Sequence, residues 1–357
     1  MLNKIISKAP ARICLFGDHQ DYMQLPIIAC AIDRYITIEA MPNQNNTLHI
    51  FKHDLNTEDI IKLSEPIEVI AEDYLRLSLI VLSRYNYVPN QGYDVHISGN
   101  IPINSGLSSS SALTVAWIQF LIRAFSINEK VSPMLIARLA YEVEVIEQNG
   151  SGGKMDQYTI SLGNSIFMNT KTDAIHTFPN ALNGMIIGDS GEGKDTLGTL
   201  SHLKGDAWKA INQVKSKYSD FDIATINSSE LEQFTPLVSE ELRPTFEAAV
   251  LNYNITKNAE KAFLESNLDY RYIGDLMNQH HQLLRDNLLI TTSKIDAMID
   301  AALKAGAYGA KIVGSGKGGC IVALTSKEKE LDVIDAIKSA GAKDAFLVKE
   351  SGGAQIL

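Results

Sequence analysis

A serine-rich segment at residues 102–112, with the sequence PINSGLSSSSA, carries the residue types best suited to bind an anion. It runs directly into an apolar stretch that begins at Leu113 and is typical of a buried helix. Backbone N–H groups in the first turn of a helix lack intrahelical partners, and together with the helix dipole they attract phosphate. The segment therefore predicts a phosphate-binding loop formed by Pro102, Asn104, Ser105, Gly106, Leu107, Ser108, Ser109, Ser110 and Ser111.

The four consecutive serines allow a second interpretation of the same segment. Serine is favoured at helix N-caps, so the run could cap an ordinary helix without binding any ligand. A serine hydroxyl can also bond a phosphate oxygen or a hard cation such as Mg²⁺, which prefers oxygen ligands. The choice between a cap and a phosphate site therefore depends on the other chemistry that the chain carries.

Three further patches combine charged residues with glycine or with a short polar turn. They are Arg12 with GDHQDY at 17–22, Glu144 with KMDQ at 154–157, and GAKIVGSGKGGC at 309–320. In the first patch, Asp18, His19 and Asp21 either bind a polar ligand or simply form the turn. In the third, Gly314 and Gly316 either make a hairpin turn or form a second wall against a nucleotide.

Glu144 follows small and apolar residues at helical spacing, with Ala140 and Tyr141 one turn before it. A carboxylate on an apolar face needs a partner, and a cation is the natural one. Glu142 stands four residues after Arg138, which predicts an ordinary surface ion pair between those two side chains.

The composition indicates a water-soluble chain with room for two domains. It has 357 residues, of which 45% are hydrophobic and 21% charged, and a formal net charge of −10. This acidity, with a sequence pI near 5.3, argues against nucleic acid or an anionic membrane as a partner. No apolar stretch reaches the roughly 18 residues of a membrane span, and there is no signal-peptide pattern. We expect a cytoplasmic protein whose three cysteines, Cys14, Cys30 and Cys320, are reduced.

The periodicity predicts strands first and then mainly helices, with a domain boundary near residues 185–205. A helix should begin at Ser132 and Pro133 and end at Asn149 and Gly150. Strands are expected at 11–16, 27–40, 48–52, 93–98, 184–189 and 345–349, with a strand, turn and strand at 309–324. Further helices are expected at 73–84, 239–263, 273–287, 293–305 and 328–340.

Together the patches resemble the three motifs of the GHMP kinase superfamily, in matching order and spacing over nearly the whole chain. PARICLFGDHQDY resembles the first motif, PINSGLSSSSA the second and GAKIVGSGKGGC the third. Within the superfamily the chain is most similar to galactokinases, which carry Gly-Glu-His-Thr-Asp-Tyr where this chain has GDHQDY. The segment Met155-Asp156-Gln157 also resembles their Met-Asp-Gln.

The resemblance implies an α+β fold of two domains, the first similar to ribosomal protein S5 domain 2 and the second ferredoxin-like. We expect these domains at residues 1–190 and 191–357, with ATP bound between them. The implied reaction transfers the γ-phosphate of ATP to a monosaccharide hydroxyl, with galactose or a related sugar phosphorylated at the anomeric position. The implied partners are the sugar, ATP and Mg²⁺.

The resemblance also implies a role for each matching residue. Asp156 would be the catalytic carboxylate and Arg12 its cationic neighbour, while Ser110 and Glu144 would bind Mg²⁺. Phosphoryl transfer depends mainly on positioning and charge neutralisation, so these groups with a phosphate loop form a sufficient set. The nucleotide would contact the serine-rich loop together with Gly314 and Gly316, and the sugar would contact Asp18, His19, Asp21 and Gly153.

Several positions depart from the galactokinase pattern. Asp18 stands in place of Glu, Gln20 in place of Thr, and residues 189–203 lack the Ser-Glu-Tyr segment that supplies a sugar-contacting Tyr. Lys154 and Lys194 are either solvated or turned toward an acidic or otherwise altered sugar. A mevalonate kinase-like enzyme and a silent sugar-binding regulator are the alternatives.

Two features weigh against those alternatives. Mevalonate kinases usually carry Lys where this chain has Arg12, so Arg12 with the His19 and Asp21 pair favours a sugar. A silent regulator could lose its catalytic groups, but Asp156 and Arg12 are both present.

Overall fold

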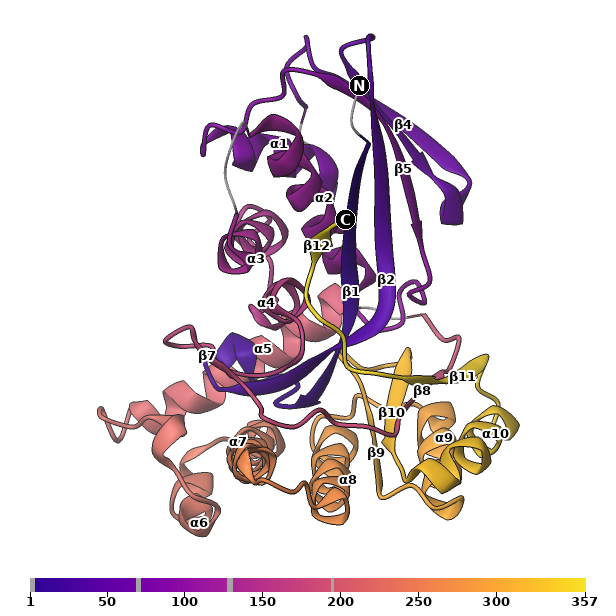
Figure 1. Cartoon of the computed structure of the whole chain (residues 1–357). Helices are drawn as coiled ribbons and strands as arrows, with labels where there is room; N and C mark the ends of the chain where they lie inside the picture. Colours follow the sequence, from indigo (N-terminus) through magenta and orange to yellow (C-terminus); the bar gives the residue numbers. More distant parts are fainter. Residues whose placement is uncertain (1–3, 69–71, 127–130, 194–195) are drawn as a thin grey trace.

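The computed structural model describes residues 4–68, 72–126, 131–193 and 196–357 of the chain. Two β-sheets, each with helices packed against it, form the upper and lower halves of the molecule in Figure 1. This mixture of separate sheets and helices confirms the expected α+β class.

The first sheet has the strand order β12-β1-β2-β5-β3-β4, with β6 and β7 branching from β2. All its strand pairs are antiparallel except β3 with β5. The first strand begins six residues earlier than predicted, and β4, β6, β7 and β12 were not predicted. The strands are β1 (Ile5–Phe16), β2 (Ile27–Asn43), β3 (Thr47–Lys52), β4 (Thr57–Lys62), β5 (Gly92–Gly99), β6 (Ser165–Asn169), β7 (Ala174–Thr177) and β12 (Gln355–Ile356).

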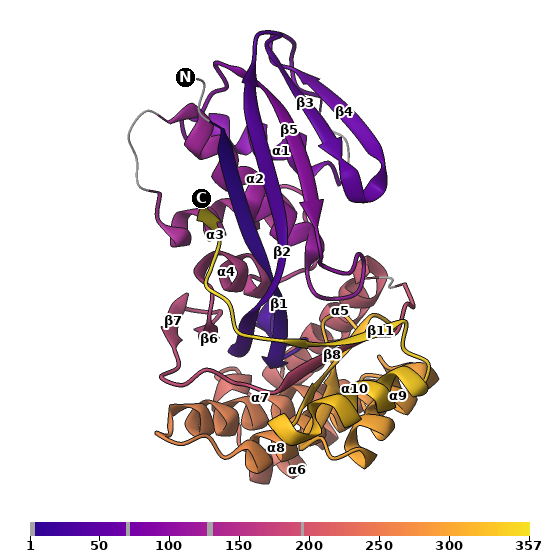
Figure 2. The same cartoon turned by 45° about the vertical axis from the view of Figure 1, so that its right-hand side comes forward.

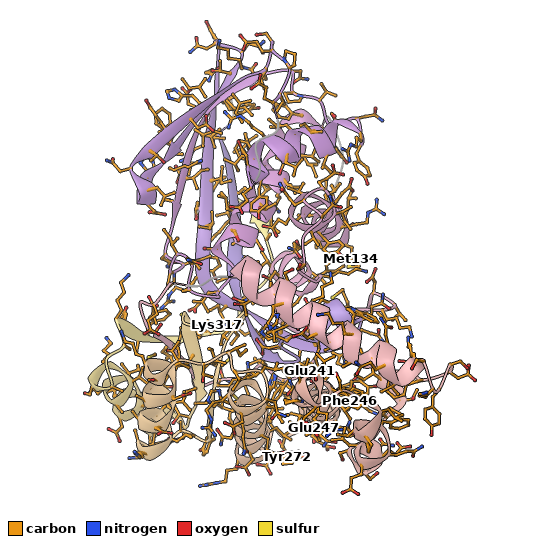
Figure 3. All side chains as sticks on the ribbon, turned by 180° about the vertical axis from the view of Figure 1, so that it is seen from behind. Met134, Glu241, Phe246, Glu247, Tyr272 and Lys317 are labelled. Carbon is orange, nitrogen blue, oxygen red and sulfur yellow. The ribbon has the colours of Figure 1, made fainter. Side chains whose placement is uncertain are left out.

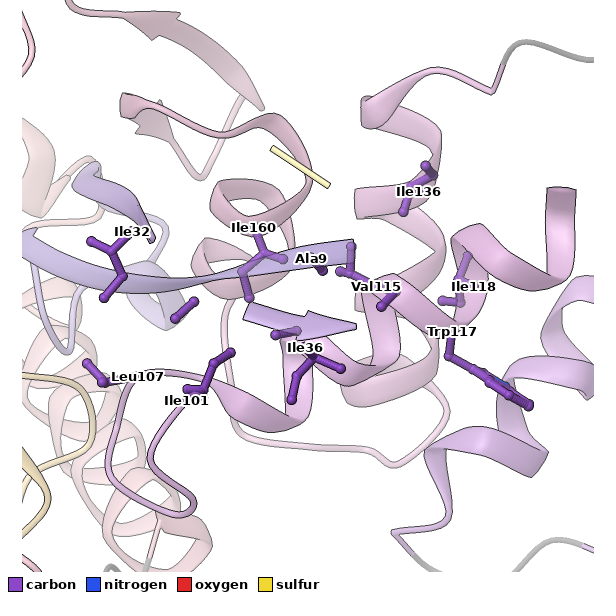
Figure 4. Close-up of a cluster of buried hydrophobic side chains, with 14 of the residues drawn as sticks. Ala9, Ile32, Ile36, Ile101, Leu107, Val115, Trp117, Ile118, Ile136 and Ile160 are labelled. Carbon is purple, nitrogen blue, oxygen red and sulfur yellow. The ribbon is translucent and has the colours of Figure 1, made fainter. Parts of the chain in front are cut away.

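One face of this sheet is covered by the helices of the first half, and the long helix α2 packs directly on β1 and β2. Its residues Val115, Trp117 and Ile118 are fully buried, as the serine-rich run followed by apolar residues predicted. Figure 4 shows Val115 beside Ala9 of the sheet, with Trp117 and Ile118 farther along the helix. The helices are α1 (Tyr74–Ser83), α2 (Ser109–Phe125), α3 (Pro133–Tyr141) and α4 (Met155–Leu162).

The second sheet is antiparallel throughout, in the order β11-β8-β10-β9. Helices α8, α9 and α10 pack against it, and α7 and α8 also lie beside β1 of the other sheet. Its strands are β8 (Met185–Asp189), β9 (Gly309–Ile312), β10 (Cys320–Leu324) and β11 (Asp344–Val348). The helices are α5 (Thr196–Lys215), α6 (Leu231–Phe234), α7 (Arg243–Leu264), α8 (Tyr270–Asp286), α9 (Ser293–Lys304) and α10 (Glu330–Ser339).

The two halves exchange segments at their junction. Strand β8 ends before residue 190 but pairs with β10 and β11 of the second sheet, whereas the C-terminal β12 returns to β1 of the first. Figure 2 shows this return, with the chain running up from β11 to the C-terminus. Seen from behind in Figure 3, α5 crosses the junction between the halves. A boundary at residue 190 would therefore leave β8 in the first domain.

The helix predicted from Ser132 to Gly150 differs from the prediction in its second half. Ser132 caps α3 by accepting a hydrogen bond from the Leu135 N–H, as expected, but the α-helix ends at Tyr141. It continues as a π-helical turn, Glu142–Ile146, in which an extra residue widens the helix. Glu144 lies inside this turn, so the irregular segment is also the one that carries a candidate functional side chain.

The described residues include no helix that is both long and apolar enough to cross a membrane. The three cysteines are all buried and form no disulfide, as expected.

Gly163 lies where the C-terminal segment crosses α4. Its φ is +78°, and a Cβ at this position would lie 1.9 Å from the backbone nitrogen of Gly353. Gly163→Ala should therefore lower the free energy of unfolding by at least about 1–3 kcal/mol, because it adds backbone strain to a clash with the crossing segment. Gly205→Ala in α5 is the matched control, since a Cβ there meets nothing within 4 Å.

Denaturant unfolding of both variants measures the difference. The Gly205 variant should gain about 0.5–1 kcal/mol, the usual benefit of alanine over glycine inside a helix. Equal stabilities for the Gly163 variant and the parent would contradict the close crossing.

Candidate active site

A cleft of about 190 Å³ opens between the two halves, at the N-terminus of α2. The structure brings together there most of the residues that the sequence singled out, from both ends of the chain. The predicted residues that line it are Arg12, Asp18, His19, Asp21, Asn104, Ser105, Gly106, Ser108, Ser109, Ser110, Gly153, Asp156 and Gly314.

The pair of Arg12 and Asp156 lies at the centre of this cleft. Arg12 on β1 donates from Nε and Nη2 to the two carboxylate oxygens of Asp156 on α4, each at 2.7 Å. Its Nη1 donates to the carbonyl of Gly106 at 2.5 Å, and Ser108 Oγ donates to Asp156. Burial opposes the charged form of Arg12, but Asp156 outweighs it, so the pKa of Arg12 is raised above its usual value. A fully charged fork thus holds Asp156 in one orientation.

Asp21 lies beside this pair without a cation of its own in hydrogen-bond contact among the described residues. Its carboxylate accepts a hydrogen bond from the Tyr22 N–H at 2.9 Å. Burial raises the pKa of Asp21 to about 6, and the nearby Asp156 carboxylate adds to the effect. Gly153 packs against it so closely that a Cβ there would lie 2.0 Å from Asp21 Oδ2. Glycine at position 153 is therefore required for Asp21 to occupy this place.

Asp18 and His19 precede Asp21 in the same turn. His19 adopts a left-handed backbone with φ of 63°, and its Nδ1 lies 3.4 Å from the Tyr22 hydroxyl. Asp18 is buried and forms an ion pair with Lys311, with 2.6 Å between Nζ and Oδ2. Although burial raises the pKa of Asp18, the Lys311 ammonium outweighs it and lowers that pKa to about 2. Gln20, also singled out, is buried against Thr256 of α7.

The residues of the serine-rich loop make different kinds of contact. Ser108 precedes α2 in a left-handed conformation, φ 59°, and contacts Asp156, whereas Ser109 and Ser110 face the cleft. Ser105 is buried, and its carbonyl accepts a hydrogen bond from the N–H of Cys320 at 2.8 Å. The side chain of Leu107 is buried in the hydrophobic core, so only its backbone is left for the expected ligand contact.

Glu144 is held by neutral donors from two helices. Its carboxylate accepts hydrogen bonds from Ser111 Oγ at 2.8 Å, from Thr114 Oγ1 at 2.9 Å and from the Gln157 amide. Burial raises the pKa of Glu144 to about 7, despite these hydrogen bonds. A partly buried carboxylate that accepts hydrogen bonds only from neutral groups and lacks an ion pair among the described residues fits a site for a hard cation.

Two details around the candidate cation site were not evident from the sequence, and the predicted partner of Glu142 is one that needs correction. The serine that contacts Glu144 is Ser111, because it lies on the face of α2 turned toward the π-helical turn, whereas Ser110 is exposed and faces the cleft. Glu142 does not pair with Arg138. It lies 3.4 Å from Arg84 and accepts a hydrogen bond from the Tyr85 hydroxyl, since the π-helical turn directs it toward the end of α1.

The third motif supplies the opposite wall of the cleft through Gly314 and Ser315. The N–H of Gly314 donates to Asp18 Oδ1 at 2.9 Å, so this wall is attached to the turn that carries His19 and Asp21. Gly316 does not line the cleft. Its φ is +84° and a Cβ there would lie 2.6 Å from Ile290, so Gly316 serves the close packing of the loop.

A larger groove of about 620 Å³ adjoins the cleft and shares Ser109 and Ser110 with it. Its walls are mainly apolar and include Leu55, which is 56% exposed, and Ile103, which is 61% exposed. Pro102 of the serine-rich segment lines this groove, and Asp189, Lys343 and Lys52 add polar groups to its walls. The groove and the cleft together form one site with two compartments that meet at the start of α2.

Some contacts of the site were not anticipated from the sequence. No individual role was predicted from the sequence for Lys311, Gln157 or Thr114, although a lysine inside the apolar strand GAKI is a signal for a buried partner. Lys154 is not freely solvated, because its ammonium forms an ion pair with Asp173 at 2.6 Å. It is also not part of the cleft lining. Lys194 lies outside the described residues.

The raised pKa of Asp21 gives a pH-dependent prediction. Below its unfolded pKa near 3.8, this carboxyl is protonated in both states and costs no folding free energy. As the pH rises, the cost of ionising it in the folded protein grows, and it levels off once the pH exceeds about 6. Asp21→Asn should therefore raise the free energy of unfolding by up to about 3 kcal/mol at pH 7.5 but hardly at pH 4. Denaturant unfolding at the two pH values measures the gain.

Asp335→Asn is the matched control, because Asp335 is exposed on α10. Its effect should stay within about 0.5 kcal/mol at both pH values. A gain for Asp21→Asn that is the same at pH 4 and pH 7.5 would show that its carboxylate is not strained in the folded protein.

Sequence profiles of one superfamily match three parts of the chain. The GHMP kinases N terminal domain matches residues 73–164, and the GHMP kinases C terminal domain matches residues 259–343. The galactokinase galactose-binding signature matches residues 3–42, which include Arg12, Asp18, His19 and Asp21.

Relatives of two activities are similar to the chain over almost their full lengths. A mevalonate kinase of Thermococcus sibiricus is 28% identical over 350 residues, which cover 95% of this chain and 94% of the relative. A galactokinase of Clostridium perfringens is 29% identical over 355 residues, which cover 95% of this chain and 89% of the relative.

Solved structures share the fold. Lactococcus lactis galactokinase in complex with galactose superimposes with a TM-score of 0.89 at 22% identity, covering 99% of this chain and 95% of its own. The mevalonate kinase of Methanococcus jannaschii superimposes with a TM-score of 0.73 at 23% identity, covering 98% and 99%. With N-terminal, C-terminal and galactose-binding matches in the expected order, the chain belongs to the GHMP kinase superfamily.

Proposed function

We propose that this protein transfers the γ-phosphate of ATP to a hydroxyl of a neutral sugar, with galactose or a related hexose phosphorylated at the anomeric position. The observation that carries the proposal is the bidentate pair of Arg12 and Asp156, which faces the cleft beside the serine-rich loop. A fixed carboxylate next to an anion-binding helix terminus is the arrangement that phosphoryl transfer to an alcohol requires.

Asp156 would orient the attacking hydroxyl and accept its proton. The hydroxyl oxygen forms a bond to the γ-phosphorus while the bond from that phosphorus to the ADP oxygen breaks, and the proton passes to the carboxylate. Arg12 holds both carboxylate oxygens, and its positive charge lies beside the charge that develops on the transferring group.

The nucleotide would occupy the larger groove, with its phosphates at the N-terminus of α2. The apolar walls of that groove suit a flat base, and Ser109 and Ser110 border both compartments. The acceptor would then lie in the smaller cleft against His19, Asp21 and Gly153. This places the acceptor hydroxyl and the terminal phosphate at the shared end of the two compartments.

Mg²⁺ would be held by Glu144 and Ser110 together with the phosphates of ATP. Glu144 offers a partly buried carboxylate that lacks an ion pair among the described residues, and Ser110 an exposed hydroxyl on the first turn of α2. A hard divalent cation there would neutralise the negative charge of the phosphate oxygens.

The charge of the cleft favours a neutral acceptor over a carboxylic acid. Among its described lining residues, Arg12 is the only lysine or arginine, and Asp156 and Gly106 already occupy its guanidinium. Asp21 adds a carboxylate at the acceptor end. An anionic acceptor would therefore meet negative charge without a free cation, whereas sugar hydroxyls can both donate to and accept from these groups.

Mevalonate is the second candidate acceptor, because the mevalonate kinase relatives are as similar in sequence as the galactokinases. Release of ADP from ATP and Mg²⁺, measured with a panel of hexoses and with mevalonate, decides between them. We expect turnover with galactose or a related hexose and none with mevalonate. Turnover with mevalonate alone would reverse the assignment, and turnover with no alcohol would leave a sugar-binding regulator.

Asp156→Asn tests the catalytic carboxylate in the same assay. The change is nearly isosteric but removes the proton acceptor, so kcat should fall by about 10²–10⁴. Asp59→Asn is the matched control, because Asp59 on β4 forms an equivalent bidentate pair with Arg76 outside the cleft, at 2.7 and 2.8 Å. The control should lose some stability but keep the parental kcat, and an unchanged kcat for Asp156→Asn would remove its role as the base.

Glu144→Gln tests the cation site. A neutral amide is a poor ligand for a hard cation, so the Mg²⁺ concentration for half-maximal rate should rise by about tenfold or more. Glu142→Gln, two residues away and bound to Arg84, should leave this concentration unchanged. A larger effect of Glu142→Gln on the Mg²⁺ requirement would place the cation on the other side of the π-helical turn.

A further inference from the structure

A fully buried lysine, Lys311, joins the two halves of the molecule behind the cleft. It lies on β9 of the second sheet and is 0% exposed. Its ammonium donates to the carbonyls of Cys14 at 3.0 Å and Ile312 at 2.8 Å, and to Asp18 Oδ2 at 2.6 Å. The three donors of the ammonium thus have three acceptors, two of them on β1 or in the turn that follows it.

Asp18 extends this connection to the glycine-rich third motif. Its second oxygen, Oδ1, accepts a hydrogen bond from the Gly314 N–H at 2.9 Å. One buried carboxylate therefore ties the turn that carries His19 and Asp21 to both β9 and the loop after it. The turn lies at the acceptor end of the cleft, and the loop forms the opposite wall.

The same loop contacts the phosphate-binding segment at its other end. The N–H of Cys320 donates to the Ser105 carbonyl at 2.8 Å, and the N–H of Gly319 donates to the Glu192 carbonyl at 3.0 Å. The loop at residues 314–320 is thus hydrogen-bonded to the acceptor turn at one end and to the serine-rich loop at the other.

Stability alone is a poor explanation for this buried pair. An apolar residue would be buried at lower cost than an ammonium, and replacing buried ion pairs by apolar residues is often neutral or stabilising. The neighbouring residues Ala310 and Ile312 of β9 are fully buried, so the strand itself does not need the charge. The connection that the pair makes between two loops of the cleft is what an apolar residue could not supply.

We propose that the pair of Lys311 and Asp18 couples acceptor binding to nucleotide binding, with both residues acting as positioning residues for the two loops. The proposal rests on the proposed function, because it takes an alcohol acceptor and ATP as the two ligands. An acceptor that fixes the turn at residues 17–22 also fixes Asp18. Through Gly314 and the loop that follows it, whose Cys320 N–H is bonded to the Ser105 carbonyl, it also positions the serine-rich loop that would hold the phosphates of the nucleotide. Coupling of this kind is reciprocal, so each ligand tightens the binding of the other.

Calorimetric titration of the full-length protein with Mg²⁺ and a non-hydrolysable ATP analogue, with and without saturating galactose, measures the coupling. In the parent, galactose should lower the Kd of the analogue by about fivefold or more. The double variant Lys311→Met/Asp18→Asn removes both charges at similar side-chain size. Its Kd for the analogue alone should stay within about threefold of the parent, while the effect of saturating galactose on the analogue falls to less than about twofold.

A matched control removes a charge pair that lies outside the cleft. Arg76→Met/Asp59→Asn deletes the bidentate pair between α1 and β4, and the coupling should remain at the parental value. Parental coupling in a folded Lys311→Met/Asp18→Asn variant would overturn the inference. A loss of more than about tenfold in galactose affinity alone, with coupling intact, would overturn it too, because Asp18 would then be a direct ligand.

Hydrogen exchange on the parent protein tests the same point without relying on the folding of any variant. Galactose alone should slow amide exchange at Gly314 and at residues 315–320, and unchanged exchange there would contradict the coupling. The parent is first assayed with the alcohol panel, and any other hexose that it phosphorylates replaces galactose in both experiments. A parent that phosphorylates no alcohol refutes the proposed function, whereas an active parent whose coupling survives in the double variant refutes this inference alone.

Discussion

The guanidinium of Arg12 is the point at which three distant segments of the chain meet. It holds both carboxylate oxygens of Asp156 from α4 and the carbonyl of Gly106 from the serine-rich loop, while its own strand runs through the first sheet. Arginine suits this place because its rigid planar fork matches a carboxylate and stays charged when buried. Removing the Asp156 carboxylate would leave the buried Arg12 guanidinium without its counter-charge. Removing Arg12 would release the serine-rich loop and α4 from each other.

The ionised forms of the acidic side chains around the pair of Arg12 and Asp156 are stabilised to different degrees. Asp18 has a lysine, and its pKa is lowered to about 2, whereas burial raises the pKa of Asp21 to about 6 and of Glu144 to about 7. Asp21 and Glu144 therefore carry an energetic cost that ligands would relieve, Asp21 by hydrogen bonds from an acceptor and Glu144 by a cation. Such local strain at a site that binds substrates is the usual trade of stability for function.

The topology explains why these groups can act together. Strand β8 enters the second sheet early, and β12 returns to the first sheet late, so the chain passes between the halves beside the cleft. The hydrogen bond between Cys320 and Ser105 and the ion pair between Lys311 and Asp18 span the same junction. The cleft is thus bordered by loops from both halves whose relative positions are fixed by buried polar contacts rather than by apolar packing alone.

The sequence by itself determined the local features: the serine-rich start of a buried helix, the Ser132 cap, the glycine turns and the order of strands followed mainly by helices. These follow from periodicity and turn chemistry within a few residues. Only the tertiary structure decided the partners of Asp18, Glu142 and Glu144 and the sheet to which β8 belongs. The pair of Asp18 and Lys311 joins residues 293 positions apart, so its formation depends on how the two sheets pack and not on any local pattern. A lysine in an apolar strand shows that a buried partner must exist, but the fold alone selects which carboxylate it is.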